Sequence, residues 1–339
     1  MNSADPLLVE TIDRLLAEVC PPDEVERAEL AGWSKPTWEA LVEAGFAWVG
    51  VPESAGGSGG TIYDTAALVH AVGRRATPVP LAETAMLGGF CLASVGLRVP
   101  NGPLAVVDSP SAVNVADGRI RVDGTVCWAR HADRIVLVAD DLVCSLRRDQ
   151  VSVTPGANLA GEARDHVFAD LVLDDVEHGD GGLGVQLRQR GALSRVLMAA
   201  GALTSIAQMT VDYTNERHQF GKPVATFQAV QQHLVTVAQS AVRAQMAADI
   251  ALRAVADERV GISVAAARVV VDDAIALGTR AAHQAHGAMG VTREYPLHQL
   301  TRRLWSWRHE WGTTVQWRRE LGDRAVAAGA DDLFALITE

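Results

Sequence analysis

Apolar side chains recur at helical spacing near the N-terminus and over most of the second half of the chain. Near the N-terminus we expect a first helix capped by Ser3, with Pro6 in its first turn and its end at Pro21–Pro22. A second helix should run from Trp38 to Phe46. In the second half, four long segments rich in Ala and Val follow the same spacing, at 187–215, 225–257, 261–286 and 312–328. Four such segments predict an antiparallel helical bundle.

The periodicity changes between residues 100 and 177, where short Val-rich stretches alternate apolar and polar positions. They lie at 104–107, 120–122, 135–139, 151–153 and 171–173, separated by Asp-Gly and Pro turn signals. The glycine-rich stretch 178–182 is expected to be a flexible linker. We therefore predict an α+β fold that is mostly α. It has an N-terminal helical domain (1–98), a shortened middle β domain (99–178) and a C-terminal helical bundle domain (179–339).

Composition and charge narrow the class of protein. The net charge of −11 argues against nucleic acid as a partner, because an acidic surface repels phosphates. We expect no membrane association and a cytoplasmic location, because we find no apolar run long enough to span a bilayer and no signal peptide. The cysteines are Cys20, Cys91, Cys127 and Cys144. They contain no Cys-x-x-Cys pair, so we expect reduced thiols and no bound metal.

The stretch Arg217–Lys222, followed by Gln228, is the first candidate for binding chemistry. It separates two predicted helices, because a glycine and a proline interrupt the helical pattern there. The guanidinium of Arg217 is a fork of donors suited to a pyrophosphate, and Phe220 offers an apolar plug. The same residues also allow a purely structural interpretation, in which Arg217 pairs with Glu216 or a chain end and Phe220 lies in the core.

A second motif lies at 284–290, which reads Gln-Ala-His-Gly-Ala-Met-Gly and is followed by Thr-Arg-Glu-Tyr-Pro at 292–296. Together, in this order and at this spacing, the two motifs resemble those of the acyl-CoA dehydrogenase family, Arg-x-x-Phe-Gly-Lys and Gln-x-x-Gly-Gly-x-Gly-x-Thr-Arg-Glu-Tyr-Pro. One departure is Ala288, where the family has its second glycine. The loop 52–57 and the pair Gly73-Arg74 also resemble family sequences.

The resemblance covers nearly the whole chain and implies an enzyme that uses FAD to dehydrogenate an acyl-CoA thioester between its α and β carbons. In the family, the two motifs reach across a subunit interface to the adenosine-pyrophosphate end of a neighbour's FAD. The residues at those positions here are Arg217, Phe220, Gln228, Gln284, Gly287 and Gly290.

Several features of the family are missing. Its hydroxyl-rich flavin segment has no counterpart between residues 103 and 119, and Arg130 replaces the usual Thr after the Trp that flanks the flavin. The two positions that hold the catalytic Glu in family members are Ser194 and Trp311 here, and neither side chain can remove a proton from carbon. We therefore assign no catalytic residue, with Glu310 as the alternative base.

These features resemble the smaller, base-lacking subunits of actinobacterial heterotetrameric acyl-CoA dehydrogenases, which act on steroid side-chain CoA thioesters. The implied partner is a longer subunit that carries the catalytic Glu, in an assembly of two copies of each chain. Two alternatives stay open: a self-sufficient homo-oligomeric dehydrogenase that uses Glu310, and a structural homologue that binds no flavin.

Overall fold

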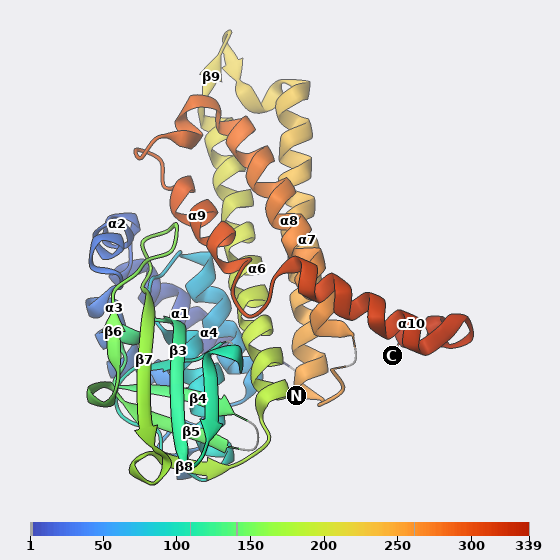
Figure 1. Cartoon of the computed structure of the whole chain (residues 1–339). Coiled ribbons are helices and arrows are strands. Elements are labelled where there is room, and N and C mark those ends of the chain that lie inside the picture. The colour runs from blue at the N-terminus through green and yellow to red at the C-terminus, as the bar shows by residue number, and fades with distance from the viewer. Residues whose placement is uncertain (1–2, 109, 140–141, 261, 339) are drawn as a thin grey trace. The chain divides into compact units, whose positions relative to one another are not determined.

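The computed structural model describes residues 3–108, 110–139, 142–260 and 262–338, which form two compact units. The first unit comprises Met1–Val69 and Thr77–Ser194, and the second comprises His70–Ala76 and Arg195–Glu339. The prediction of a mostly helical α+β fold is confirmed: N-terminal helices precede two small sheets, and a helical part follows (Figure 1). The predicted domain boundaries at residues 98 and 178 stay a prediction.

The N-terminal helices are α1 (Pro6–Val19), α2 (Pro22–Ala31), α3 (Lys35–Glu43), α4 (Ile62–Arg74) and α5 (Phe90–Ser94), and a π-helical segment, Ala82–Gly89, leads into α5. The predicted N-cap was wrong, because the Asp5 carboxylate, not Ser3, accepts the hydrogen bond from the Leu7 N–H at 2.8 Å. The predicted second helix begins and ends three residues earlier than expected, at Lys35 and Glu43. It stops before Phe46 because Gly45 has a φ of 76°, which no α-helix contains.

The middle of the chain forms two four-stranded sheets. The first has the order β1-β4-β5-β8, with strands β1 (Leu104–Val106), β4 (Arg134–Ala139), β5 (Leu142–Arg147) and β8 (Glu177–Asp180). The second has the order β2-β3-β7-β6, with strands β2 (Val113–Ala116), β3 (Arg119–Cys127), β7 (Arg164–Val172) and β6 (Ser152–Thr154). Only the β1–β4 pair is parallel among the described strands. Buried residues from both sheets share one hydrophobic core, which includes Ile120, Val122, Ile135 and Leu137.

The predicted linker at 178–182 was wrong in its first half. Glu177–Asp180 form β8, which pairs with β5 in the register Cys144↔His178. Glycine-rich composition suggested flexibility, but Gly179 packs against Val95, with only 2.8 Å between the position of an added Cβ and the Val95 Cβ. The glycine therefore allows a close approach, and the chain is held there as an edge strand.

The C-terminal part holds α6 (Gly184–Glu216), α7 (Gln228–Ala256), α8 (Ser263–His286), α9 (Leu297–Trp307) and α10 (Thr314–Thr338). The predicted start of the third helix at 261 lies at a residue outside the described ranges. Helices α7 and α8 run side by side (Figure 1) and bury small residues of each helix, among them Ala244, Ala248 and Ala274. The sequence analysis did not predict α9, a short helix whose buried apolar residues Leu297, Leu300, Leu304 and Trp307 recur at helical spacing.

Within the second unit, the last turn of α4 lies directly against α6. A Cβ added at Gly201 would lie 2.2 Å from the backbone oxygen of His70, and one added at Gly73 would lie 2.1 Å from the backbone oxygen of Met198. Both distances are far below van der Waals contact, so each helix needs a glycine at the crossing. The pair Gly73-Arg74, which resembles a family sequence, thus marks the end of α4 and also a helix contact.

Helix α6 contains a stretch that is, by its length and composition, apolar enough to cross a bilayer. The expectation that the chain holds no such stretch was therefore wrong. In the structure 72% of that stretch is buried inside the protein. Its apolar character is that of a core helix.

Candidate cofactor-binding site

The C-terminal ends of α6 and α8 and the hairpin that precedes α7 enclose a pocket of about 250 Å³. Its lining residues are Tyr213, Arg217, Gln219, Val224, Val230, Gln284, Ala285, His286, Gly287, Ala288 and Met289. The two motifs singled out in the sequence therefore meet in space. Three of the six predicted site residues, Arg217, Gln284 and Gly287, line this pocket, whereas Phe220, Gln228 and Gly290 do not.

The hairpin consists of β9 (His218–Gln219) and β10 (Lys222–Pro223), so Phe220 and Gly221 are its two turn residues. Their φ values of 52° and 78° are those of a type I′ turn, which suits the twist of a tight hairpin. Phe220 is 91% exposed, and its ring lies in a T-shaped arrangement with that of Phe227, at 6.1 Å between centroids. The interpretation of Phe220 as a core residue is therefore wrong, because the turn holds the ring out in solvent. Its role as an apolar plug against a ligand stays a prediction.

Arg217 closes the last turn of α6. Its N–H donates to the Tyr213 carbonyl at 2.9 Å, and its own carbonyl accepts from the Val224 N–H at 2.8 Å. The guanidinium is exposed and makes no ion pair with any residue that the structure describes, so the alternative pairing with Glu216 is not observed. An arginine that lines a pocket without a carboxylate beside it is available to an anionic ligand.

The second motif begins at the end of α8. Gly287 caps the helix with a φ of 59° and donates its N–H to the carbonyls of His283 and Gln284. Ala288, the departure from the family pattern, follows in a 3₁₀ turn without a positive φ, so an alanine fits there. Gly290 is buried, and an added Cβ would lie 2.9 Å from the Cβ of His286. Gly290 thus shapes the loop without lining the pocket.

Aromatic rings form one wall of the pocket, which sequence reasoning missed. The His286 imidazole stacks on Tyr213 with 4.5 Å between centroids and an interplanar angle of 20°, and Tyr295 packs against both rings. His286 Nδ1 lies 2.8 Å from the Ala282 carbonyl, to which it donates, and its Nε2 is buried without a hydrogen-bond partner in the described chain. Burial, together with the charge of His283, lowers the pKa of His286, so the ring is neutral at pH 7.

The sequence did contain a signal for this wall, because Tyr213 precedes Arg217 by one helical turn and His286 lies inside the second motif. Gln228, in contrast, is the first residue of α7 and is exposed outside the pocket. The pocket residues fit the nucleotide end of FAD: an unpaired guanidinium suits a pyrophosphate, a positive-φ glycine allows close backbone approach, and a flat ring stack offers an aromatic surface.

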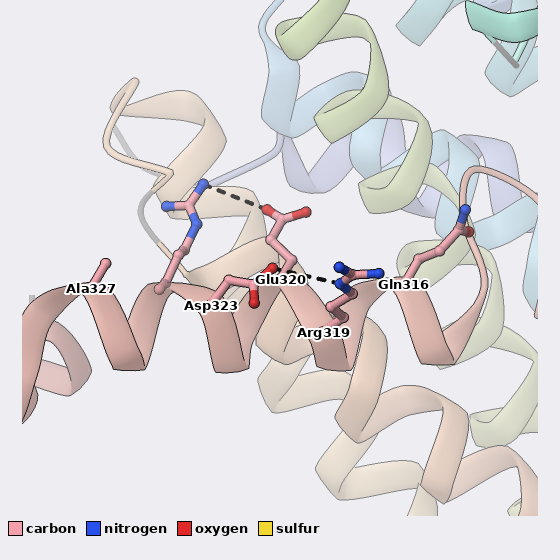
Figure 2. A pocket seen from close by; sticks show the side chains of 6 residues that line it. Gln316, Arg319, Glu320, Asp323 and Ala327 are labelled. Atoms are coloured by element: carbon pink, nitrogen blue, oxygen red, sulfur yellow. Dashed lines mark hydrogen bonds and ion pairs between the residues drawn. The ribbon is translucent and has the colours of Figure 1, made fainter.

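A second hollow, about 460 Å³ and shallow, runs along one face of α10 (Figure 2). Its charged side chains pair with one another along the helix, Arg319 with Asp323 at 3.8 Å and Arg324 with Glu320 at 3.5 Å. Exposed pairs of this kind contribute little free energy and do not converge on a point. We assign no ligand to this hollow.

Glu310, the alternative base, lies at a buried position in the second unit. Its Oε2 accepts a hydrogen bond from the Arg195 Nε at 2.6 Å, and the two side chains are 10% and 1% exposed. Arg195 directly follows Ser194, the first expected base position, within α6. The carboxylate of Glu310, next to the second expected position, is therefore bound by the arginine next to the first. A carboxylate held in such a pair is a poor candidate for taking a proton from a substrate.

The loop around Glu310 is fixed from its backbone side as well. Nη2 of the buried Arg268 lies within hydrogen-bond distance of three carbonyls, those of Arg308 at 3.1 Å, Glu310 at 3.3 Å and Gly312 at 3.0 Å. Burial lowers the pKa of Arg268, with Asp272 opposing that effect. Trp311 is buried with a φ of 58°, so the residue at the second base position fills space inside the unit.

In the first unit, an ion pair holds the loop that follows Trp128, the Trp that the family resemblance places beside a flavin. Arg130 Nε lies 3.3 Å from the Oδ1 of the buried Asp165, and its Nη2 donates to the Gly156 carbonyl at 2.6 Å. His131 stacks on Trp33 at 4.8 Å, and burial, aided by the Arg130 charge, lowers its pKa to about 4. Where family members have a Thr, this chain has a side chain engaged internally. Ser109, in the shortened stretch before this loop, lies outside the described residues.

Two family models match the chain. "Acyl-CoA dehydrogenase, N-terminal domain" covers residues 3–96, and "Acyl-CoA dehydrogenase, C-terminal domain" covers residues 182–325. Among curated relatives, acyl-CoA dehydrogenase FadE28 of Mycobacterium tuberculosis is 30% identical over 295 residues, which is 78% of this chain and 84% of FadE28. The fold and the pocket therefore define a flavoprotein dehydrogenase scaffold, and the chain belongs to the acyl-CoA dehydrogenase family.

Solved structures show the same fold. The ChsE4–ChsE5 complex from Mycobacterium tuberculosis superposes with a TM-score of 0.84 at 23% identity, over 97% of this chain and 100% of the matched chain. The Tcur3481–Tcur3483 steroid ACAD G363A variant superposes with a TM-score of 0.85 at 20% identity, over 95% of this chain and 98% of the matched chain. The shared architecture therefore extends through nearly the whole chain.

Proposed function

We propose that this chain is one subunit of an FAD-dependent acyl-CoA dehydrogenase complex. In that complex it contributes the adenosine-pyrophosphate side of the FAD site, and a longer partner subunit supplies the catalytic Glu. The observation that carries the proposal is a contrast within the second unit. Arg217 lines a pocket with its guanidinium unpaired, whereas Glu310, the nearest candidate base, is bound to Arg195 at 2.6 Å.

The reaction sets the requirement that this chain does not meet alone. FAD, when bound, accepts the hydride from the β carbon of the acyl-CoA thioester, and a carboxylate must take the α proton. Ser194 is buried and donates to the Gly191 carbonyl at 2.7 Å, and Trp311 has no basic group. With Glu310 occupied, a carboxylate from another chain is required.

For binding the cofactor, the chain offers residues suited to one end of it. Arg217 would hold the pyrophosphate, and Gln284, Gly287 and the His286–Tyr213 stack would surround the adenosine end. The other predicted contacts lie outside the pocket. Phe220 is at the hairpin tip, Gln228 begins α7, and Gly290 lies inside the loop after α8. In contrast, the position at which family members have a Thr that faces the flavin ring is Arg130 here, and its side chain is paired with Asp165.

Two features support a hetero-oligomer, which we propose to hold two copies of each chain. The hairpin presents Phe220 to solvent at its tip, where the ring is placed to pack on the surface of another chain. The two solved relatives described above each carry two names, ChsE4 with ChsE5 in a complex and Tcur3481 with Tcur3483. One of them is a steroid ACAD, and we extend that substrate class, a steroid side-chain CoA thioester, to this chain. A cytoplasmic location follows from the same proposal.

The test is to express this chain alone and together with each longer acyl-CoA dehydrogenase subunit of its genome. The measurements are particle mass, bound FAD and acyl-CoA oxidation. We expect FAD and turnover only in a mixed complex. Stoichiometric FAD with turnover from this chain by itself would establish the homo-oligomeric alternative, and a mixed complex without FAD would establish the structural one.

The assignment of Arg217 has its own test in the active complex. Arg217→Ala should weaken FAD binding by about ten- to hundredfold, since a charge-assisted hydrogen bond contributes roughly 1.5–3 kcal/mol. Arg280→Ala, an exposed arginine on α8 outside the pocket, is the matched control and should leave FAD binding unchanged. Equal FAD affinity in the two variants would remove Arg217 from the site.

A further inference from the structure

The pocket at the ends of α6 and α8 is built by one continuous part of the chain. Its lining residues lie between Tyr213 and Met289, within the second unit. Its volume of about 250 Å³ is below the roughly 300–1,000 Å³ of pockets that enclose a whole drug-sized ligand. The pocket therefore suits one end of a dinucleotide and not the whole molecule.

Hydrogen bonds within the chain hold the elements around the pocket together. The Arg217 carbonyl accepts from the Val224 N–H at 2.8 Å, which closes the hairpin on the end of α6. The Tyr213 hydroxyl donates to the His286 carbonyl at 3.2 Å, which ties α6 to the end of α8. In the loop after α8, the Tyr295 hydroxyl donates to a backbone carbonyl of α6 at 3.1 Å. The arrangement of these elements therefore does not depend on a partner chain.

The aromatic wall of the pocket is fixed in the same way. The His286 imidazole is held by the hydrogen bond from its Nδ1 to the Ala282 carbonyl at 2.8 Å and by stacking on Tyr213 at 4.5 Å between centroids. A wall that is ordered in advance lowers the entropy cost of binding, and the free chain already has it. The C-terminal ends of α6 and α8 carry partial negative charge, which opposes an anion. Arg217, exposed at this pocket, has to supply the attraction for a diphosphate.

We propose that this pocket binds free ADP before the two subunits pair, and that ADP competes there with FAD for assembly of the mixed complex. The ligand chemistry is an adenosine diphosphate group, which comes either from FAD or from the free nucleotide. The proposal rests on the proposed function, because it takes the pocket to be the adenosine-pyrophosphate side of an FAD site that two chains share.

The competition follows from which chains each ligand contacts. FAD bridges both subunits, so it raises their affinity for each other by the same factor by which pairing raises the affinity for FAD. ADP fills the pocket of this chain and has no flavin to reach the partner. An ADP molecule in the pocket therefore excludes FAD and removes that gain in pairing affinity.

Calorimetric titration of the full chain without its partner tests the first part. ADP should bind at one site per chain, and FMN, the other half of FAD, should not bind at the same concentrations. Arg217→Ala should raise the Kd for ADP by at least about tenfold, since it removes charge-assisted hydrogen bonds to the diphosphate. Arg217→Lys, which keeps the charge without the fork of donors, should lie between that variant and the wild type. Arg280→Ala, at an exposed arginine of α8 outside the pocket, is the control and should leave the Kd unchanged.

Assembly with the longer subunit tests the second part. The FAD concentration needed for half-maximal formation of the mixed complex should rise in proportion to ADP once ADP exceeds the Kd measured on the free chain. A chain that binds no ADP, or binds it equally well as Arg217→Ala, while the mixed complex holds FAD would leave the proposed function sound and overturn this inference. An FAD requirement that ADP does not change would overturn the competition. ADP binding by a chain that forms no FAD-containing complex with any longer subunit would refute the proposed function and the competition, and would leave a nucleotide pocket in the free chain.

Discussion

Replacing Glu310 by Gln separates the two roles that this carboxylate could have. In the structure it neutralises Arg195, at 2.6 Å and with the Arg195 side chain only 1% exposed. Removing one partner of a buried ion pair leaves an uncompensated charge and typically costs about 3–5 kcal/mol. We expect Glu310→Gln to lower the free energy of unfolding by about 3 kcal/mol, near the lower limit, because the amide oxygen can still accept a hydrogen bond.

The double variant Arg195→Met/Glu310→Met gives the complementary measurement. It removes both charges and leaves apolar side chains of similar length, so its free energy of unfolding should return close to the wild-type value. Asp323→Asn, which breaks the exposed pair with Arg319 on α10, is the control and should cost less than about 1 kcal/mol. Urea denaturation of the free chain measures all three differences.

Catalysis provides the decisive comparison. If Glu310 is a structural partner of Arg195, the folded mixed complex with Glu310→Gln should oxidise acyl-CoA within about tenfold of the wild-type rate. Loss of a true base for a carbon acid typically costs about a hundredfold or more. An unchanged free energy of unfolding combined with a collapse of turnover would refute the reasoning and revive the self-sufficient homo-oligomer.

Three further predictions follow from other parts of the structure. Gly201→Ala should lower the free energy of unfolding by about 1–3 kcal/mol, because the added methyl group meets the His70 carbonyl, whereas Gly322→Ala on α10, with open space around it, should not destabilise; urea denaturation of both variants tests this. The pKa of His131 is about 4 in the folded chain and near 6.5 in the unfolded chain. Between these two pH values the imidazole is neutral when folded but takes up a proton when unfolded. Its contribution to stability is therefore complete above pH 6.5 and is lost as the pH falls towards 4, and His131→Phe should melt with a weaker dependence on pH over that range than the wild type; equal slopes would contradict the assignment. Phe220→Ser should leave the melting temperature of the free chain unchanged, because the ring is 91% exposed, but should weaken the mixed complex, and a lower melting temperature of the free chain would show that the ring packs internally.

The fold was predictable from the sequence where periodicity is long and regular. The Ala- and Val-rich segments became α6, α7 and α8 with bounds within a few residues of those expected, because small apolar residues at helical spacing fit only helix–helix packing. The short elements were predicted less well, and α9, β2, β5 and β8 were missed. Strands β2 and β5 form hairpins with β3 and β4, their neighbours in the chain, whereas β8 pairs with β5 in the register Cys144↔His178, a contact that local preference does not encode.

The candidate site shows the same division. The motifs identified Arg217, Gln284 and Gly287 because their spacing is local, and the structure places all three around one pocket. The pairing of Glu310 with Arg195 joins residues 115 positions apart, so the sequence could offer only a neighbouring arginine as a partner. Phe220 was misplaced because hydrophobicity predicts burial within one chain and takes no account of a turn that holds the ring in solvent.

The second unit is discontinuous in sequence, since it takes His70–Ala76 from the N-terminal third of the chain and seats them against α6 through Gly73 and Gly201. During synthesis, the ribosome releases those seven residues more than a hundred residues before the helix that they contact. The second unit therefore cannot complete its folding until α6 has emerged, and a C-terminal fragment that begins at Arg195 would lack part of its own core. A genetic cut between the two units would have to leave α4 with the C-terminal half, which makes this chain a poor candidate for division into separately expressed halves.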